Sequence, residues 1–314
     1  MQYLFAWRYF KSKKSTSAIN IIAWVSVTAI AVGAAALIVI LSVFNGFEDL
    51  VKGLYTDFYA DMRVLPAEGK QITLDSNTVY KITSIDGVTA VSKVIEEKAL
   101  LANGDYQSIV VVKGVDSVFA STNNIGKHIV RGVYEMGDVQ NPGIVMGAGI
   151  ENAVGVDVTK GGFPLTLYTP NKGAGFDAVD GMFAFNITAK GVFAVQQEFD
   201  NKFIFTNIDF LRYMLSMTPN QVSGLELKIN GRPEKIKAAI QHAIGKNFTV
   251  ETRYEQNKNL YAVMQMEKWI IYGILSLILI VAAFNMIGAL TMLVLEKQKD
   301  ISVLRAMGSS TALV

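Results

Sequence analysis

Two long stretches without a charged residue constrain this chain more than any other feature. Residues 15–47 and 269–295 contain no Asp, Glu, Lys or Arg, and neither contains proline. About 20 apolar residues are enough to cross the hydrocarbon core of a bilayer as a helix. A helix in a soluble core is usually shorter, and the apolar part of a signal peptide spans only about 7 to 15 residues. Both stretches therefore predict transmembrane helices, and the first is predicted to be an uncleaved anchor.

The composition agrees with a membrane protein and excludes several kinds of site. Charged residues make up 18% of the chain and hydrophobic residues 51%, whereas a soluble domain carries about a quarter charged residues. The net charge of +2 gives no basic field for nucleic acid. The chain has no cysteine, and its two histidines argue against a multi-histidine zinc site. No phosphate-loop, H-E-x-x-H or G-x-S-x-G motif occurs. We therefore expect no catalytic residues, metal or cofactor on this chain.

Charge placement predicts the side of the membrane on which each part lies. Residues 1–14 carry four basic residues and no acid, and Lys297, Lys299 and Arg305 follow the second stretch. Between residues 48 and 268, acidic residues outnumber basic ones. Because basic flanks stay in the cytoplasm, both ends are predicted inside and the central part outside.

The central part has the pattern of a mixed α and β domain. Two strand-like runs, Val91–Leu101 and Ser108–Val115, flank Asn103-Gly104, which predicts a hairpin with a type I′ turn. Further strands are predicted at residues 143–146, 163–168, 184–195, 203–205, 224–229 and 248–251, and helices at 77–85, 208–216 and 233–244. The predicted fold class is a membrane protein with α-helical spans and a large α+β domain inserted between span 1 and span 2.

Apolar residues at helical spacing continue both predicted spans outward. After the first span they are Phe47, Leu50, Val51, Leu54 and Phe58, and before the second span they are Leu260, Val263 and Met264. These stripes either pack on one another or on the domain, or they line a cavity for an apolar ligand, where flexible methionine suits variable contacts. Within the spans, Gly33 lies on a small-residue surface and Asn285 is a lone amide, and both predict packing between helices.

A short amphipathic run follows the second span. Ile301, Leu304 and Met307 share one helix face, and Gly308 is a suitable helix stop. Such a helix lies on lipid or docks in a groove of a partner protein. Its mixed charge disfavours the lipid alternative, because anionic lipid attracts purely basic faces.

Four segments of the chain resemble a known family of permeases. The run VAAFNMIGALTMLVLEKQKDISVLRAMG, which ends at Gly308, resembles the second span and coupling helix of the FtsX-like permeases, and most of all the LolC/LolE branch of lipoprotein-releasing ABC transporters. LSVFNGFED, FAWRYFKSKK and GIVMGAGIENAVGVDVTKGGFPLTLYTP are similar to the same branch and occur in the same order. The resemblance extends over nearly the whole chain.

This resemblance implies a domain layout and a set of partners. Residues 1–15 would form a cytoplasmic interfacial segment, 16–60 the first transmembrane helix with its stalk, 61–254 a MacB-like periplasmic core domain, 255–295 the second stalk and transmembrane helix, and 296–314 the coupling helix. Family spans 3 and 4 are absent, so we expect this chain to be truncated. The implied partners are an ABC ATPase subunit that binds ATP and Mg, a second permease subunit, a lipoprotein substrate and a periplasmic lipoprotein carrier, all at the cell inner membrane.

The resemblance also implies roles for individual residues. Coupling to the ATPase would involve Glu296, Lys299, Asp300, Ile301, Leu304, Arg305 and Gly308. The outward stripes of Phe47, Leu50, Val51, Leu54, Leu260, Val263 and Met264 would line the lipid cavity. The glycine-rich loop after Tyr168 would dock the carrier through Lys172, Phe176, Met182 and Phe183.

Two alternatives fit the same pattern. One is a MacB-like efflux or envelope-stress permease with a different substrate. The other is a two-span sensor, which would share the topology of an external domain with both ends inside.

Overall fold

The computed structural model describes residues 18–161, 164–170 and 182–308. The chain divides into two compact units, a membrane unit (Met1–Asp49 with Leu260–Val314) and an outer unit (Leu50–Asn259). The predicted interfacial segment, residues 1–15, lies outside the described residues.

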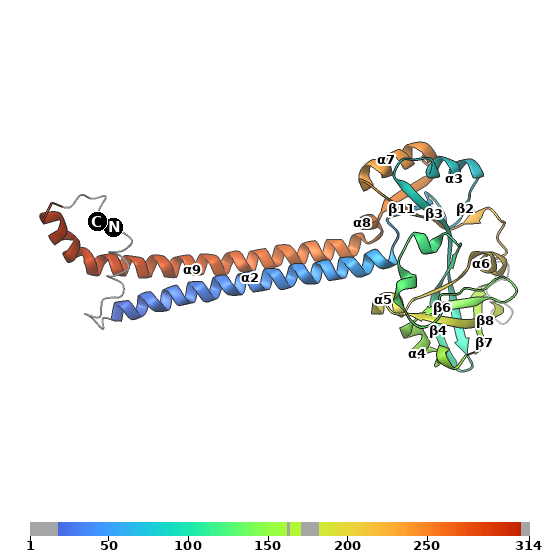
Figure 1. Ribbon diagram of the computed structural model, residues 1–314, viewed down its shortest axis with the longest axis horizontal. Helices are drawn as coiled ribbons and strands as arrows, with labels where there is room; N and C mark the ends of the chain where they lie inside the picture. The colour runs from blue at the N-terminus through green and yellow to red at the C-terminus, as the bar shows by residue number, and fades with distance from the viewer. Residues whose placement is uncertain (1–17, 162–163, 171–181, 309–314) are drawn as a thin grey trace. The chain divides into compact units, whose positions relative to one another are not determined.

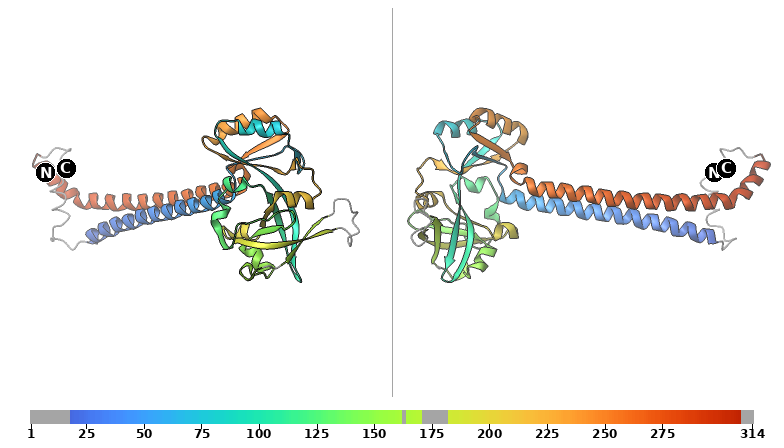
Figure 2. Two further views of the ribbon diagram at one scale, coloured as in Figure 1. Left: turned by 45° about the vertical axis from the view of Figure 1, so that its right-hand side comes forward. Right: turned by 180° about the vertical axis from the view of Figure 1, so that it is seen from behind.

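Two long helices make up the described part of the membrane unit. Helix α2 runs from Ala18 to Phe58 and helix α9 from Lys258 to Ala306, and both contain segments long and apolar enough to cross a membrane. They lie side by side in Figures 1 and 2. Large apolar side chains, among them Ile38, Leu277 and Phe284, are more than half exposed. Such surfaces require lipid or further helices around them.

The outer unit is built on one large mixed sheet of ten strands. Its order is β12 (Phe248–Thr252), β1 (Met62–Pro66), β11 (Gly224–Ile229), β3 (Val88–Asn103), β4 (Tyr106–Val115), β9 (Phe203–Asn207), β6 (Gly143–Gly147), β8 (Met182–Phe193) and β5 (Ile129–Gly132), with β7 (Pro164–Pro170) pairing with β3 and β8. The pairs β4–β9 and β6–β8 are parallel, and the other pairs are antiparallel. A second sheet pairs β2 (Ile72–Thr73) with β10 (Gln221–Val222).

One face of the large sheet, here called the aliphatic face, packs against helices. Successive side chains of a strand point to opposite faces, and alternate β3 residues such as Ile95 and Leu101 enter a continuous aliphatic core. Ile82 of α3 (Ser76–Thr83), Ile240 of α7 (Pro233–Ile244) and Leu211 of α6 (Ile208–Met214) belong to the same core. Helices α3 and α7 lie together over one end of the sheet in Figure 1.

Most elements expected from the sequence are present, with one turn differing. The helix predicted at 233–244 and the strand at 224–229 have the predicted bounds, and the hairpin of β3 and β4 is confirmed. The predicted Asn103-Gly104 type I′ turn is wrong. Asn103 pairs with Tyr106, so Gly104 and Asp105 form the loop, and Gly104 alone of the two has a positive φ. A type I′ turn needs positive φ at both loop residues.

Candidate functional site

The opposite face of the sheet, here called the docking face, receives the last turns of α2. Tyr55 and Phe58 belong to the outer unit and are 4% and 2% exposed. The ring of Phe58 stacks on Phe199 of the short helix α5 (Gln197–Asp200), with centroids 4.0 Å apart and planes 5° apart. Tyr55 meets Phe199 edge-on at 5.0 Å, and Phe203 of β9 lies 4.9 Å from Phe58. These rings form an aromatic cluster that embeds the helix end in the domain.

Apolar spacing in the sequence explains which side of α2 enters the cluster. Tyr55 and Phe58 lie three residues apart, and residues at that separation share one face of a helix. Phe199, which is fully buried, supplies the opposing ring from a segment far along the chain. Burial of aromatic rings contributes much of the stability of such a contact, and each well-oriented pair adds about 0.5–1.5 kcal/mol.

Polar contacts fix the end of α2 around the aromatic cluster. The Tyr55 hydroxyl donates to Glu198 Oε2 at 2.6 Å. Asp57 accepts from Asn124 Nδ2 at 2.8 Å, and its second oxygen lies 3.0 Å from His128 Nε2. The backbone N–H of Asn124 donates to the Asp57 carbonyl at 3.1 Å. The helix end is therefore held by directional bonds as well as by packing.

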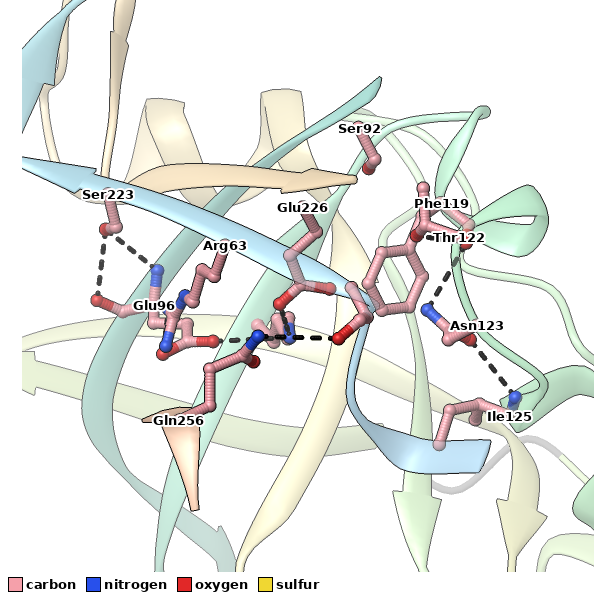
Figure 3. Close-up of polar contacts among 12 residues, drawn as sticks. Arg63, Ser92, Glu96, Phe119, Thr122, Asn123, Ile125, Ser223, Glu226 and Gln256 are labelled. Carbon is pink, nitrogen blue, oxygen red and sulfur yellow. Dashed lines mark hydrogen bonds and ion pairs between the residues drawn. The ribbon is translucent and has the colours of Figure 1, made fainter. Parts of the chain in front are cut away.

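Beside the cluster lies a buried network of four charged side chains (Figure 3). Arg63 of β1 and Glu96 of β3 pair at 2.7 Å, and Lys113 of β4 lies 3.3 Å from Glu96. Lys113 also pairs with Glu226 of β11, and these two side chains are only 3% and 2% exposed. The Glu96 N–H donates to Ser223 Oγ at 3.0 Å. The network joins the β3–β4 hairpin to β1 and to β11, which lies far along the chain.

Opposite charges set the pKa values of Glu96 and Arg63 in this network. Burial by itself raises the pKa of Glu96, but the charges of Lys113 and Arg63 outweigh burial and lower that pKa to about 2. The same acids hold the pKa of Arg63 above its usual value, against the effect of burial. Nearby, burial and the charge of Glu198 raise the pKa of Tyr59 to about 12. Glu96, Arg63 and Tyr59 thus each keep one charge state at neutral pH.

A hollow of about 370 Å³ opens on the same face. Arg63, Glu96 and Phe203 belong both to its wall and to the network or cluster. Its rim adds Lys70, Lys98, Lys202 and Glu97. No group of three or more His, Asp or Glu side chains that could hold a metal occurs in the described ranges. The side chains of this face therefore hold the end of α2 and line a hollow with charged residues at its rim.

The predicted coupling residues lie at the far end of α9. Glu296, Lys299, Asp300, Ile301, Leu304 and Arg305 all belong to this helix, which continues without a break from the apolar segment. Gly308 follows the helix with φ +88°, a conformation that suits glycine at a helix end. Helical continuity from the predicted span into the coupling segment is confirmed, and contact with an ATPase stays a prediction.

The predicted cavity residues all lie on the two long helices. Phe47, Leu260, Val263 and Met264 belong to the membrane unit, and Leu50, Val51 and Leu54 to the outer unit. Phe47 and Leu50 are both 61% exposed. The lipid cavity itself stays a prediction.

The remaining predicted residues are placed only in part. Lys172 and Phe176 lie outside the described residues, while Met182 and Phe183 are exposed at the start of β8. β7 and β8 pair up to Pro170 and Met182, so the predicted carrier loop connects two paired strands. Gly33 has no neighbour within 4 Å of an added Cβ, and Asn285 is exposed, so their roles in helix packing stay predictions.

Sequence analysis missed the aromatic cluster and the charged network. Nothing in the sequence singled out Glu198, whose carboxylate accepts a hydrogen bond from Tyr55. A usable signal did exist for the network. Lys113 and Glu226 each stand next to apolar residues in their strands, in VVVKGV and in GLEL. Charges at such positions are buried and need a partner.

The domain, its attached helices and its docking face define a class of protein. The model of the MacB-like periplasmic core domain matches residues 23–243, and the chain belongs to this family. The MacB-like core domain expected between the two spans is thereby confirmed.

Curated relatives are similar along almost the entire chain. It is 29% identical to the lipoprotein-releasing system transmembrane protein LolC of Neisseria meningitidis serogroup B, over 97% of this chain and 73% of that protein. It is 25% identical to the corresponding LolE of Haemophilus influenzae, over 99% of this chain and 75% of that protein. The resemblance to FtsX-like permeases of the LolC/LolE branch is confirmed.

Two solved structures are similar to part of this chain. The periplasmic region of MacB from Actinobacillus actinomycetemcomitans has a TM-score of 0.43 at 10% identity and covers 64% of this chain and 92% of its own. The extracellular domain of the transporter YknZ from Gram-positive bacteria has a TM-score of 0.41 at 10% identity, with 61% and 99% covered. The family assignment rests on the sequence matches.

Proposed function

We propose that this chain is the permease subunit of an ABC-type transporter that releases lipoproteins. A separate ATPase subunit hydrolyses ATP, and the transporter extracts lipoproteins from the outer leaflet of the inner membrane and passes them to a periplasmic carrier. The names of the LolC and LolE relatives and the two apolar helices support this function. In this proposal both termini are cytoplasmic and the outer unit is periplasmic.

The embedded end of α2 is the observation that carries the mechanism. Phe58 stacks on Phe199 inside the outer unit, and Tyr55 is bound to Glu198. A displacement of α2 along its axis cannot be absorbed at this junction without separating buried rings. In this proposal, movement started by the ATPase passes along α2 and rearranges the outer unit.

Energetics explain why such a release needs ATP. Each buried CH₂ of an acyl chain contributes about 0.8 kcal/mol to membrane attachment, so a lipoprotein with several chains leaves the bilayer very slowly without work. In the proposed machine, the ATPase closes on nucleotide, pushes the coupling segment of α9, and this push changes the walls around the acyl chains.

The proposal assigns roles to the residues already located. The segment from Glu296 to Gly308 docks in the ATPase, with Ile301 and Leu304 as apolar contacts and Lys299 and Arg305 setting register. The stripes around Leu50 and Val263 contact acyl chains. The loop between β7 and β8 docks the carrier.

The direct test of the proposed function replaces Leu304 with Asp in the full-length protein expressed with its ATPase. A carboxylate on the apolar face would lose its hydration when the contact with the ATPase forms, which is costly. The ATPase should therefore no longer co-purify, and lipoprotein release should stop. Ser302→Asp adds the same charge on another side of the helix and should keep both. Membrane insertion should be unchanged in either variant. Unchanged co-purification of Leu304→Asp would contradict the assignment.

Two other functions remain distinguishable from this one. A MacB-like efflux or envelope-stress permease would retain ATPase binding but would not release lipoproteins. A two-span sensor would bind no ATPase at all. Lipoprotein release from native membrane vesicles, with and without ATP, separates the three.

A further inference from the structure

The two uncharged stretches end at a pair of opposite charges that the structure brings together. Glu48 is the first charged residue after the first stretch, and Lys268 is the last one before the second stretch. In the membrane unit, Lys268 Nζ lies 3.0 Å from Glu48 Oε2, and the side chains are 30% and 14% exposed. The outer ends of the two apolar segments are therefore level with each other.

A lysine at this position needs a partner. Basic residues are disfavoured on the outer side of a membrane protein, and an unpaired charge at the edge of the hydrocarbon layer loses much of its hydration. The carboxylate of Glu48 faces the same cost, and pairing removes it for both. Trp269, which follows Lys268 directly, is the kind of residue that marks the membrane interface.

The ion pair fixes one axial register between the two helices. Most side chains along α2 and α9 are apolar. Apolar contacts are not directional, so they fix the axial position of one helix against the other less strictly than an ion pair does. An axial shift of one helical turn is about 5.4 Å. Such a shift separates two atoms that now lie 3.0 Å apart.

We propose that Glu48 and Lys268 are positioning residues that hold the outer ends of the two spans in register. With the pair intact, a push on the coupling segment of α9 also moves α2, whose end is embedded in the aromatic cluster. With the pair broken, part of the push is lost as sliding between the helices. This inference rests on the proposed transport function and adds the residues that keep its two moving helices together.

Charge reversal and exchange test the inference in the full-length protein with its ATPase. Glu48→Lys and Lys268→Glu should each lower lipoprotein release per ATP hydrolysed by at least about fivefold, the lower end of typical coupling effects. The double variant restores an opposite pair and should recover most of the release, and Lys268→Arg should behave as wild type. Glu267→Lys, an exposed neighbour of Lys268, is the matched control and should have no effect.

A covalent link gives a second, independent measurement. These 314 residues contain no cysteine, so Glu48→Cys with Lys268→Cys introduces one thiol on each helix; any cysteine elsewhere in the full-length protein is replaced by serine. After reaction with a short bifunctional thiol reagent, the linked protein should release lipoprotein, whereas the unlinked double variant should resemble the single reversals.

Defined results would overturn the inference. These are wild-type release per ATP in both charge reversals, an exchanged pair no better than either single variant, or a linked protein as inactive as the unlinked one. Failure of the unaltered protein to bind its ATPase or to release lipoproteins would instead overturn the proposed function.

Discussion

The two faces of the large sheet are both buried, but they use different chemistry. On the aliphatic face, Ile95 and Leu101 pack with the helices α3, α6 and α7. On the docking face, aromatic rings and ion pairs receive the end of α2. Aliphatic packing tolerates changes of similar volume, whereas stacked rings and paired charges require fixed positions. The comparison suggests that the first face mainly stabilises the domain and that the second also connects it to a helix.

Removing one charge from the network should have the largest effect and would distinguish the two faces most clearly. Lys113→Met leaves Glu226 buried without its partner, so the free energy of unfolding should fall by about 3–5 kcal/mol. Lys113→Met with Glu226→Leu removes both charges and should recover most of that loss, because Glu96 keeps Arg63. Thermal unfolding of the full protein in detergent measures both. Equal destabilisation by the single and double variants would contradict the pairing.

Loss of one hydroxyl at the helix end should have an intermediate effect. Tyr55→Phe keeps the ring in the aromatic cluster but removes the bond to Glu198. We expect a loss of about 1.5 kcal/mol, the low end for a bond to a charged group, because Glu198 is exposed and can bind water instead. Tyr106→Phe, at an exposed position, should leave the unfolding temperature unchanged. A Tyr55→Phe protein as stable as wild type would show that the hydroxyl does not help to hold the end of α2.

Acid should weaken the docking face without any substitution. The pKa of Glu96 is lowered to about 2 in the folded protein from an ordinary value of 4.5. Its contribution to stability is therefore complete above pH 4.5 and is lost as the pH falls toward 2. Glu96→Gln should flatten the decline in unfolding temperature over this range, and Glu68→Gln, at an exposed site, should not. An identical decline in unfolding temperature with falling pH in Glu96→Gln and wild type would contradict the lowered pKa of Glu96.

The aliphatic face could be predicted from the sequence far better than the docking face. Period-two and helical spacing are local signals, so β11 and α7 were placed with their observed bounds. The pairing of Lys113 with Glu226, or of Phe58 with Phe199, depends on which distant strands become neighbours. No local pattern carries that information. The turn after β3 was misplaced by one residue because Asn103 still pairs in the ladder.

The same distinction applies to the proposed functional residues. The apolar spans and the coupling segment follow from charge-free runs and helical spacing, and α9 joins them in one helix. The carrier loop and the lipid cavity depend on partners or on residues outside the described part. Their assignment therefore comes from the family resemblance rather than from geometry.

One measurement tests the passage of movement through α2 most directly, namely lipoprotein release per ATP hydrolysed in two variants that each lose buried apolar contacts. Phe199→Leu removes the ring that stacks on Phe58, and Ile240→Ala removes most of a buried side chain from the aliphatic face, which costs about 2–5 kcal/mol. The account predicts normal ATP hydrolysis in both, with release per ATP lowered only in Phe199→Leu. Equal release per ATP in the two variants would contradict it.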